Sequence, residues 1–219
     1  MEAGGPSLCL VLASASPRRR KLLEQLGIPF EVVPADVPEE IPVDASSAEG
    51  CAATLALRKA RSIADQPGFP DAIVLAADTV VAVYESGSVR ILGKPGNAEE
   101  ARAMLRSLSG RTHAVHTGVA LAGAAWSRPA VEVVTTEVRF RPLSPAEIDA
   151  YVATGEPYDK AGGYGIQGGA AAFVEHIRGD YYNVVGLPLA RVRELLSSTF
   201  PRIAPAPPPP VVPFAIICA

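Results

Sequence analysis

The stretch LCLVLASASPRRR, at residues 8–20, joins an apolar run directly to the start of a helix. Residues 8–13 are continuously apolar, which is typical of a buried strand. Pro17 follows Ser16, and a proline in the first helical position after a serine favours a helix that begins there and stops at Gly27. A buried strand that passes at once into a helix indicates an α/β fold.

The same alternation of strand and helix signals continues along the 219-residue chain. Further strands are expected at residues 30–33, 72–77, 80–84, 89–92, 113–121, 131–140, 173–177 and 182–185. Further helices are expected at residues 46–65, 97–110, 144–155 and 187–197. The length suits one mid-sized domain or two small lobes, and the pattern predicts the α/β class with a mixed sheet.

The composition limits the class of function. Hydrophobic residues make up 48% of the chain and charged residues 20%, so the chain can bury a core and is not intrinsically disordered. The formal net charge is −3, whereas a general nucleic-acid binder needs an excess of basic residues. An aromatic content of 6% also provides few stacking platforms for single strands. We therefore expect no nucleic-acid partner.

Cysteine usage and the apolar segments indicate the compartment. Cys9, Cys51 and Cys218 form no ligand-spaced cluster with the 3 histidines, so neither a structural zinc site nor a disulfide framework is indicated. No apolar run approaches the roughly 18 residues that span a membrane, and the N-terminus lacks a secretory signal. We expect a reducing, cytoplasmic setting and no membrane partner. Prolines gather at residues 205–210, which predicts an extended tail after the folded body.

The turn after the first expected strand combines hydroxyl and guanidinium groups. Ser14 and Ser16 are followed by Arg18, Arg19 and Arg20. A helix N-terminus favours an anion, and forked guanidinium donors fit phosphate oxygens. The alternative is that Ser16 caps the helix and the arginines form a solvated face. Because three arginines at a helix start oppose the helix dipole, the sequence favours an anionic partner such as a phosphate.

Asp78 is expected at the end of the strand at residues 72–77. In α/β sheets, ligands gather at the carboxyl ends of strands, where a carboxylate can hold a hard cation or activate a water. A turn-forming aspartate is the alternative. Glu39 and Glu40 lie in a loop flanked by prolines. They could supply a second carboxylate to a metal or form a solvated charge pair.

Two later segments add a lysine and a glycine-rich loop. Gly93-Lys94-Pro95 is not a Walker A loop, because no serine or threonine follows Lys94. Lys94 is either a point charge for a phosphate or a solvated lysine. Residues 161–169 contain a formal dinucleotide fingerprint, but no buried strand leads into it, so we reject that interpretation. A loop so rich in glycine lets the backbone approach a ligand closely, and Gln167 could recognise a base edge. Asp159 and Lys160 adjoin the loop.

His113 and His116 lie on one expected strand with an odd spacing between them. Side chains at odd spacing face opposite sides of a strand, so the two imidazoles cannot bind one ion together and structural roles are expected. No Gly-x-Ser-x-Gly elbow or Cys/His pairing supports a nucleophilic hydrolase.

These segments together resemble one family, the Maf-like nucleotide pyrophosphatases. The matching pieces, in family order, are SASPRR at 14–19, Lys59-Ala60, ADTVV at 77–81, LGKP at 92–95, Leu108-Ser109-Gly110, His113, Thr117-Gly118-Val119, GEPYDKAGGYGIQG at 155–168 and GDYYNVVGLP at 179–188. The body also resembles the Maf-like domain of acetylserotonin O-methyltransferase-like proteins. The resemblance implies a Maf-like domain at residues 8–198, an N-terminal extension at 1–7 and a proline-rich C-terminal tail at 199–219.

The family resemblance implies an elongated, mixed-sheet α/β fold of the Maf/inosine-triphosphatase-like type, with two lobes around a central cleft and often a homodimer. It implies hydrolysis of a nucleoside triphosphate between its α and β phosphates, which gives the monophosphate and pyrophosphate. It also implies a divalent metal cation as cofactor, Mg²⁺ or Mn²⁺.

The resemblance further assigns roles to residues of this sequence. Asp78 matches the catalytic proton acceptor, with Lys59 and Lys94 as further catalytic residues. Arg18, Thr79 and Gln167 match positions that set base selectivity. The remaining matches are Ser14 and Arg19 as substrate contacts and Glu39, with Asp78, as a metal ligand.

Gln167 also indicates the branch of the family. The loop resembles the branch that acts on dTTP and UTP, whereas a glutamate usually stands there in the branch that acts on 7-methyl-GTP. The chemistry agrees, because a neutral amide can pair with a pyrimidine's carbonyl and N–H, while a carboxylate favours a positively charged methylated guanine. The sequence therefore predicts a dTTP/UTP pyrophosphatase, with modified pyrimidine triphosphates as further candidate substrates. The alternatives are a nucleotide-binding regulator linked to cell division that does not hydrolyse its ligand, and an adaptor whose proline tail recruits a partner.

Overall fold

The computed structural model describes residues 9–38, 47–85, 87–124 and 126–199. Its strands are β1 (Cys9–Leu12), β2 (Phe30–Val32), β3 (Ala72–Glu85), β4 (Ser88–Leu92), β5 (Thr112–Ala122), β6 (Ala130–Phe140) and β7 (Val174–Arg178). Its helices are α1 (Pro17–Glu24), α2 (Ala48–Ala64), α3 (Ala98–Leu108), α4 (Pro145–Ala153), α5 (Tyr181–Val185) and α6 (Leu189–Thr199), with 3-10 turns η1 (Glu156–Asp159), η2 (Ala161–Gly163) and η3 (Gly169–Phe173). The expected extension at residues 1–7, Glu39, Glu40 and the tail beyond Thr199 lie outside the described residues.

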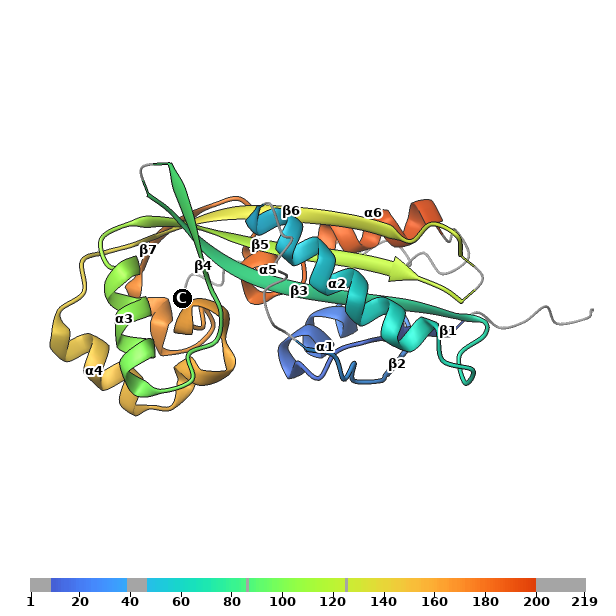
Figure 1. Ribbon diagram of the computed structural model, residues 1–219, viewed down its shortest axis with the longest axis horizontal. Helices are drawn as coiled ribbons and strands as arrows, with labels where there is room; N and C mark the ends of the chain where they lie inside the picture. Colours follow the sequence, from blue (N-terminus) through green and yellow to red (C-terminus); the bar gives the residue numbers. More distant parts are fainter. Residues whose placement is uncertain (1–8, 39–46, 86, 125, 200–219) are drawn as a thin grey trace, which may run out of the picture.

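The strands form one mixed sheet of seven, in the order β2-β1-β3-β5-β6-β7, with β4 also paired to β3. β1 runs parallel to β2 and β3, and the remaining pairs are antiparallel. The long strands β3, β5 and β6 run along the whole molecule, which is elongated, and helices gather into a lobe at either end (Figure 1). The predicted mixed α/β fold with two lobes is confirmed.

Strand β3 is the element that both lobes share. On one edge it pairs with β5 over residues 74–82. On its other edge it pairs with β1 over residues 72–75 and then with β4 over residues 81–85. Residues 76–80 therefore have no partner strand on that second edge within the described part of the chain. The cleft between the lobes opens at this gap.

The expectation of two strands that are separated at Asp78 is wrong. Residues 72–85 form one continuous strand, in which Asp78 pairs with Gly118 and Thr79 with Thr117 of β5. The charged and hydroxyl side chains interrupt the apolar pattern, but the backbone ladder to β5 continues beneath them. Asp78 thus lies in the middle of a strand rather than at its end.

Helix α2 covers one face of the sheet and packs unusually close to it. Small side chains permit this approach, and Ala52, Ala56 and Ala60 of α2 are fully buried. The closest point is Gly118 of β5, where a Cβ would lie 2.2 Å from the carbonyl oxygen of Ala52. A side chain at this position would push α2 away from the sheet.

The opposite face of the sheet carries two separate apolar cores. One lies at the β1 end and includes Leu12 and Leu75 with Leu23 of α1 and Leu196 of α6. The other lies at the β4 end and packs residues of α3, α4 and η3 on the sheet, around Phe140. The stretch of sheet between these cores carries Thr79 and other polar side chains, and it forms the floor of the cleft.

The strand expected at residues 182–185 is also wrong, because this segment is helix α5. Asp180 caps the helix by accepting the N–H of Tyr182 at 2.7 Å, and Gly186 ends it with a φ of 121°. The pair of valines favours a strand locally, but the cap at one end and the glycine at the other determine a single helical turn. The other expected elements are present, with bounds that differ by a few residues.

Across the described ranges, none of the helices combines the length and the apolar character that crossing a membrane requires.

We expect Gly118→Ala to lower the free energy of unfolding by about 1–3 kcal/mol, because its Cβ meets backbone of α2 that cannot move without disturbing the sheet. Chemical denaturation of the purified variant would measure this change. Gly68→Ala is the matched control, since nothing lies within 4 Å of a Cβ at that position. Equal stability of the two variants would contradict the tight contact between α2 and β5.

Candidate active site

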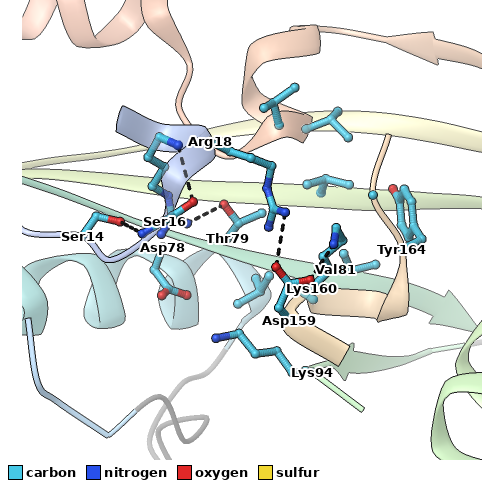
Figure 2. A pocket seen from close by; sticks show the side chains of 18 of the residues that line it. Ser14, Ser16, Arg18, Asp78, Thr79, Val81, Lys94, Asp159, Lys160 and Tyr164 are labelled. Carbon is cyan, nitrogen blue, oxygen red and sulfur yellow. Dashed lines mark hydrogen bonds and ion pairs between the residues drawn. The ribbon is translucent and has the colours of Figure 1, made fainter. Parts of the chain in front are cut away.

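A cavity of about 600 Å³ occupies the gap along β3, between the two lobes. Figure 2 shows Ser14, Asp78, Thr79 and Lys94 around this opening. All the site residues that the sequence predicts, apart from Glu39, line this one cleft: Ser14, Arg18, Arg19, Lys59, Asp78, Thr79, Lys94 and Gln167. Glu39 lies outside the described residues, so its expected place beside Asp78 stays a prediction.

A buried ion pair lies at the centre of the cleft. Lys59 Nζ of α2 donates to Asp78 Oδ1 at 2.6 Å, and the two residues are only 6% and 7% exposed. Both side chains lie on the face of the sheet that α2 covers. The close packing of α2 brings the ammonium group to the carboxylate. The pairing suits the burial of both groups, because a buried charge without an opposite charge nearby is strongly unfavourable.

The turn between β1 and α1 is built as the sequence predicts for a helix start. Ser16 Oγ accepts the N–H of Arg19 at 3.4 Å, and Ser14 Oγ accepts the N–H of Ser16 at 3.2 Å. Ser16 is thus the N-cap of α1, whose first turn contains no acidic residue. Because both hydroxyl oxygens accept here, their O–H groups are able to donate to an anion in the cleft.

The three arginines at this helix start have different surroundings. Arg20 points outward and pairs with Glu24 on the surface. Arg19 and Arg18 instead line the cleft, so the interpretation of the whole run as a solvated face holds only for Arg20. Two guanidinium groups thus lie in the cleft beside the N-terminus of α1.

Arg19 is fixed by hydrogen bonds below the cleft. Its Nε donates to the carbonyl oxygen of Gly186 at 2.8 Å and its Nη2 to Thr79 Oγ1 at 3.1 Å. Thr79 Oγ1 lies 2.9 Å from Thr117 Oγ1, which donates to the carbonyl oxygen of Asn183 at 2.9 Å. This network links α1, the sheet and α5 across the polar stretch between the two cores.

Arg18 reaches across the cleft to the other lobe. Its Nη1 lies 3.4 Å from Asp159 Oδ2, and Asp159 Oδ1 also pairs with Lys160 Nζ at 2.5 Å (Figure 2). Burial would raise the pKa of Asp159, but the hydrogen bond and charge of Lys160 together with the charge of Arg18 hold it below its usual value. Asp159 is therefore a carboxylate that holds Arg18 over the cavity.

The glycine-rich segment forms the wall of the cleft opposite α1. η1 precedes it instead of a strand, so the rejection of a dinucleotide-binding fingerprint is confirmed. The N–H of Gly162 donates to the carbonyl oxygen of Gly93 at 3.0 Å, and this bond ties the segment to the loop of Lys94. Gly162 has a φ of 70° and lies against Val81, where a Cβ would clash. Lys94 and Gln167 are thereby placed on the same wall.

His113 and His116 face opposite sides of β5, as their spacing predicts. His113 Nε2 lies 2.8 Å from the Tyr164 hydroxyl, and Tyr164 lines the cleft. His116 instead contacts Tyr84 and Thr135 through its two ring nitrogens. Both histidines are buried and structural.

Sequence reasoning assigned no role to Thr117 or Asn183, which complete the network below Arg19. Both lie within the segments that resemble the family, but their function depends on pairings that the sequence does not display. Asn183 is fully buried and donates through Nδ2 to the carbonyl oxygen of Val115 at 3.0 Å and to Thr136 Oγ1 at 2.9 Å. The signal in the sequence is a polar asparagine within the otherwise apolar run expected to form a strand at residues 182–185.

The donors in the cleft are compatible with a divalent cation of the magnesium type. Among the residues that the structure describes, no three His, Cys, Asp or Glu side chains gather into a ready-made metal site. Mg²⁺ is commonly held by one or two carboxylates together with phosphate oxygens of the substrate and waters. Asp78 offers one such carboxylate in a cleft whose lining contains more cationic than anionic side chains.

The fold and the cleft together define a two-lobed α/β protein with a cationic cleft around one buried carboxylate. A family model described as "Maf-like protein" matches residues 9–199, so the chain belongs to the Maf-like family. The chain is 54% identical over 188 residues to the dTTP/UTP pyrophosphatase of Moorella thermoacetica, covering 86% of this chain and 93% of that protein. It is 52% identical over 187 residues to the dTTP/UTP pyrophosphatase of Bacillus cereus strain AH820, covering 85% and 93%.

The buried imidazole behind Tyr164 gives the fold a specific pH dependence. Burial lowers the pKa of His113 from 6.5 to about 4. The unfolded chain therefore takes up a proton below pH about 6.5, while the folded chain does so only near pH 4. The resulting contribution to stability is present above pH about 6.5 and is lost as the pH falls toward 4.

We expect the wild-type protein to lose about 2 kcal/mol more stability between pH 7 and pH 4.5 than His113→Gln does. The glutamine cannot take up this proton, yet it can still hydrogen-bond to Tyr164. Urea denaturation of both proteins across this pH range measures the difference. Parallel stability profiles would show that His113 is not held neutral by burial.

Proposed function

We propose that this protein hydrolyses dTTP and UTP between the α and β phosphates, releasing the nucleoside monophosphate and pyrophosphate. The observation that carries the proposal is the placement of the buried Asp78–Lys59 pair in the same cleft as the hydroxyls and arginines of the β1–α1 turn. Relatives that are more than half identical over most of the chain are named for this activity.

The cations of the cleft suit a triphosphate. The substrate brings about four negative charges at neutral pH, and cleavage transfers further charge to the departing pyrophosphate. Arg18 and Arg19 reach the cleft from α1 and Lys94 from the opposite wall, so positive groups surround the space available to the phosphates. Cations that are fixed before the reaction stabilise the developing charge without reorganising.

Asp78 is the group that activates the attacking water in this proposal. The water oxygen forms a bond to the α phosphorus, the bond to the bridging oxygen breaks, and pyrophosphate leaves with that electron pair. The Asp78 carboxylate accepts the proton of the water, while Lys59 holds the carboxylate in place through Oδ1. Ser14 is placed to donate to a phosphate oxygen.

Gln167 is the proposed reader of the base. Its neutral amide offers one acceptor and one pair of donors, which match the carbonyl and N–H of thymine or uracil. Arg18 and Thr79 line the same cleft and are the proposed partners in base selection. Modified pyrimidines with the same carbonyl and N–H are substrates under this proposal.

The proposal includes a divalent cation, Mg²⁺ or Mn²⁺, held by Asp78 and by Glu39. A bound cation of this kind supplies Lewis-acid stabilisation of phosphate charge. A cytoplasmic location, a homodimer and the absence of a nucleic-acid partner stay predictions from the composition and the family resemblance.

A product assay tests the function. Purified protein with Mg²⁺ is offered dTTP, UTP, CTP, GTP and 7-methyl-GTP separately, and monophosphate and pyrophosphate are quantified. We expect selective turnover of dTTP and UTP that a chelator abolishes and added Mg²⁺ or Mn²⁺ restores. Turnover of 7-methyl-GTP alone would overturn the pyrimidine assignment. Tight binding without product in folded protein would instead support a nucleotide-binding regulator, which no observation in the structure favours.

We expect Asp78→Asn to lower kcat for dTTP by at least about 100-fold, because the amide cannot accept the proton of the water. The variant should stay folded, since the asparagine oxygen can still accept the Lys59 hydrogen bond. Steady-state kinetics and thermal melting check both statements. Asp71→Asn, which changes an exposed carboxylate in the turn just before the same strand, is the control and should leave kcat unchanged. Near-normal turnover by the folded Asp78→Asn protein would remove Asp78 from the mechanism.

A further inference from the structure

Gln167 lies at the middle of a short segment whose two ends are held by one pair of side chains. The N–H of Gly165 donates to the hydroxyl oxygen of Tyr151 at 3.1 Å. The Tyr151 hydroxyl in turn donates to Glu156 Oε1 at 2.9 Å, and Glu156 Oε2 accepts the N–H of Gly169 at 3.0 Å. These three hydrogen bonds and the segment form a closed ring. We call these two side chains the Tyr151–Glu156 bracket.

Two glycines of the segment lie in close contact with the side chains of this bracket. A Cβ at Gly168 would lie 2.0 Å from Glu156 Oε1, and one at Gly169 would lie 3.3 Å from the Tyr151 ring. The backbone therefore passes directly over the carboxylate, and a Cβ at Gly168 would require the Glu156 carboxylate to leave this position. Such close contact fixes the path of the backbone on both sides of Gln167.

The bracket itself rests on a well-fixed part of the second lobe. Tyr151 belongs to α4, and its ring packs edge-on against Phe173 with centroids 5.2 Å apart. Burial raises the pKa of Tyr151, so the phenol keeps its proton at neutral pH and can donate to Glu156 while it accepts from Gly165. The carbonyl oxygen of Glu156 also accepts from Lys160 Nζ at 2.8 Å.

We propose that Tyr151 and Glu156 are positioning residues that set the pyrimidine selectivity of this enzyme by fixing the backbone on both sides of Gln167. The inference rests on the proposed function, in which Gln167 recognises the base. Neither side chain needs to touch the base. A carboxamide distinguishes uracil from cytosine only where its place relative to the base is defined, and small misplacements of such groups are costly.

The sensitive test is Tyr151→Phe, which keeps the packed ring and removes only the hydroxyl at the centre of the bracket. We expect the ratio of kcat/KM for UTP to that for CTP to fall by about three- to tenfold, as for loss of one useful hydrogen bond. A role limited to stability would lower activity toward both nucleotides together and leave the ratio unchanged.

A double-mutant cycle separates action through Gln167 from a general disturbance. Gln167→Ala alone should lower the UTP to CTP ratio, and adding Tyr151→Phe in that background should lower it no further. Tyr84→Phe is the matched control, because it removes a phenol-to-carboxylate hydrogen bond to Glu49 outside the cleft. It should leave the ratio at the wild-type value.

The outcomes distinguish the bracket from the function on which it depends. Absence of UTP turnover in the wild-type protein would overturn the proposed function and the bracket's role together. If the wild-type protein turns over UTP but Tyr151→Phe leaves the UTP to CTP ratio unchanged, the bracket's role alone is overturned. The same holds if Tyr151→Phe lowers this ratio as much in the Gln167→Ala background as in the wild-type protein. Should Tyr151→Phe not fold, Glu156→Gln replaces it. This variant alters both bonds of the Glu156 carboxylate, to Tyr151 and to the N–H of Gly169, and should lower the ratio in the same direction. An unchanged ratio in that variant would be equally decisive.

Discussion

The structure depends on how the long strand β3 is shared between two sets of partners. One edge is continuous with β5, while the other is divided between β1, which runs parallel, and β4, which runs antiparallel. The two partners cannot meet, because one ends at Leu12 and the other enters from the opposite lobe. Within the described parts of the chain, residues 76–80 of β3 therefore have no partner strand on this second edge. The sheet thus creates the cleft through its topology, and the loops only line its walls.

Burial of Asp78 at this gap imposes a second requirement. A carboxylate in the middle of a covered strand needs a partner, and Lys59 meets this need from α2. The ammonium reaches the carboxylate because α2 is rich in alanine and β5 has a glycine at residue 118. The alternation of the strand then places Thr79 on the other face, where it joins Arg19. The adjacent residues Asp78 and Thr79 thus connect the sheet to α2 on one face and to α1 on the other.

The sequence predicted the class, the mixed sheet and most elements, because buried runs, caps and glycine stops are local signals. It also indicated Ser14, Arg19, Lys94 and the other residues that the structure gathers in one cleft. It failed where the deciding interaction is distant. The continuity of β3 through Asp78 depends on its pairing with β5. The α5 helix depends on its cap at Asp180 and on Gly186, which together override the preference of two valines for a strand. The bracket of Tyr151 and Glu156 was also missed, since hydrogen bonds between a helix and the backbone of a later loop have no pattern in the sequence.

The course of the long strands has a mechanical consequence. β3 and β5 belong to both lobes and exchange hydrogen bonds along the whole floor of the cleft. The lobes are therefore joined by a hydrogen-bonded ladder and not by a single flexible linker of the kind that serves as a hinge in many two-lobed proteins. The continuous strands thus connect the two walls of the cleft, which the Arg18–Asp159 ion pair also bridges. The spacing between the walls of the cleft is therefore set by the sheet itself, before any ligand binds.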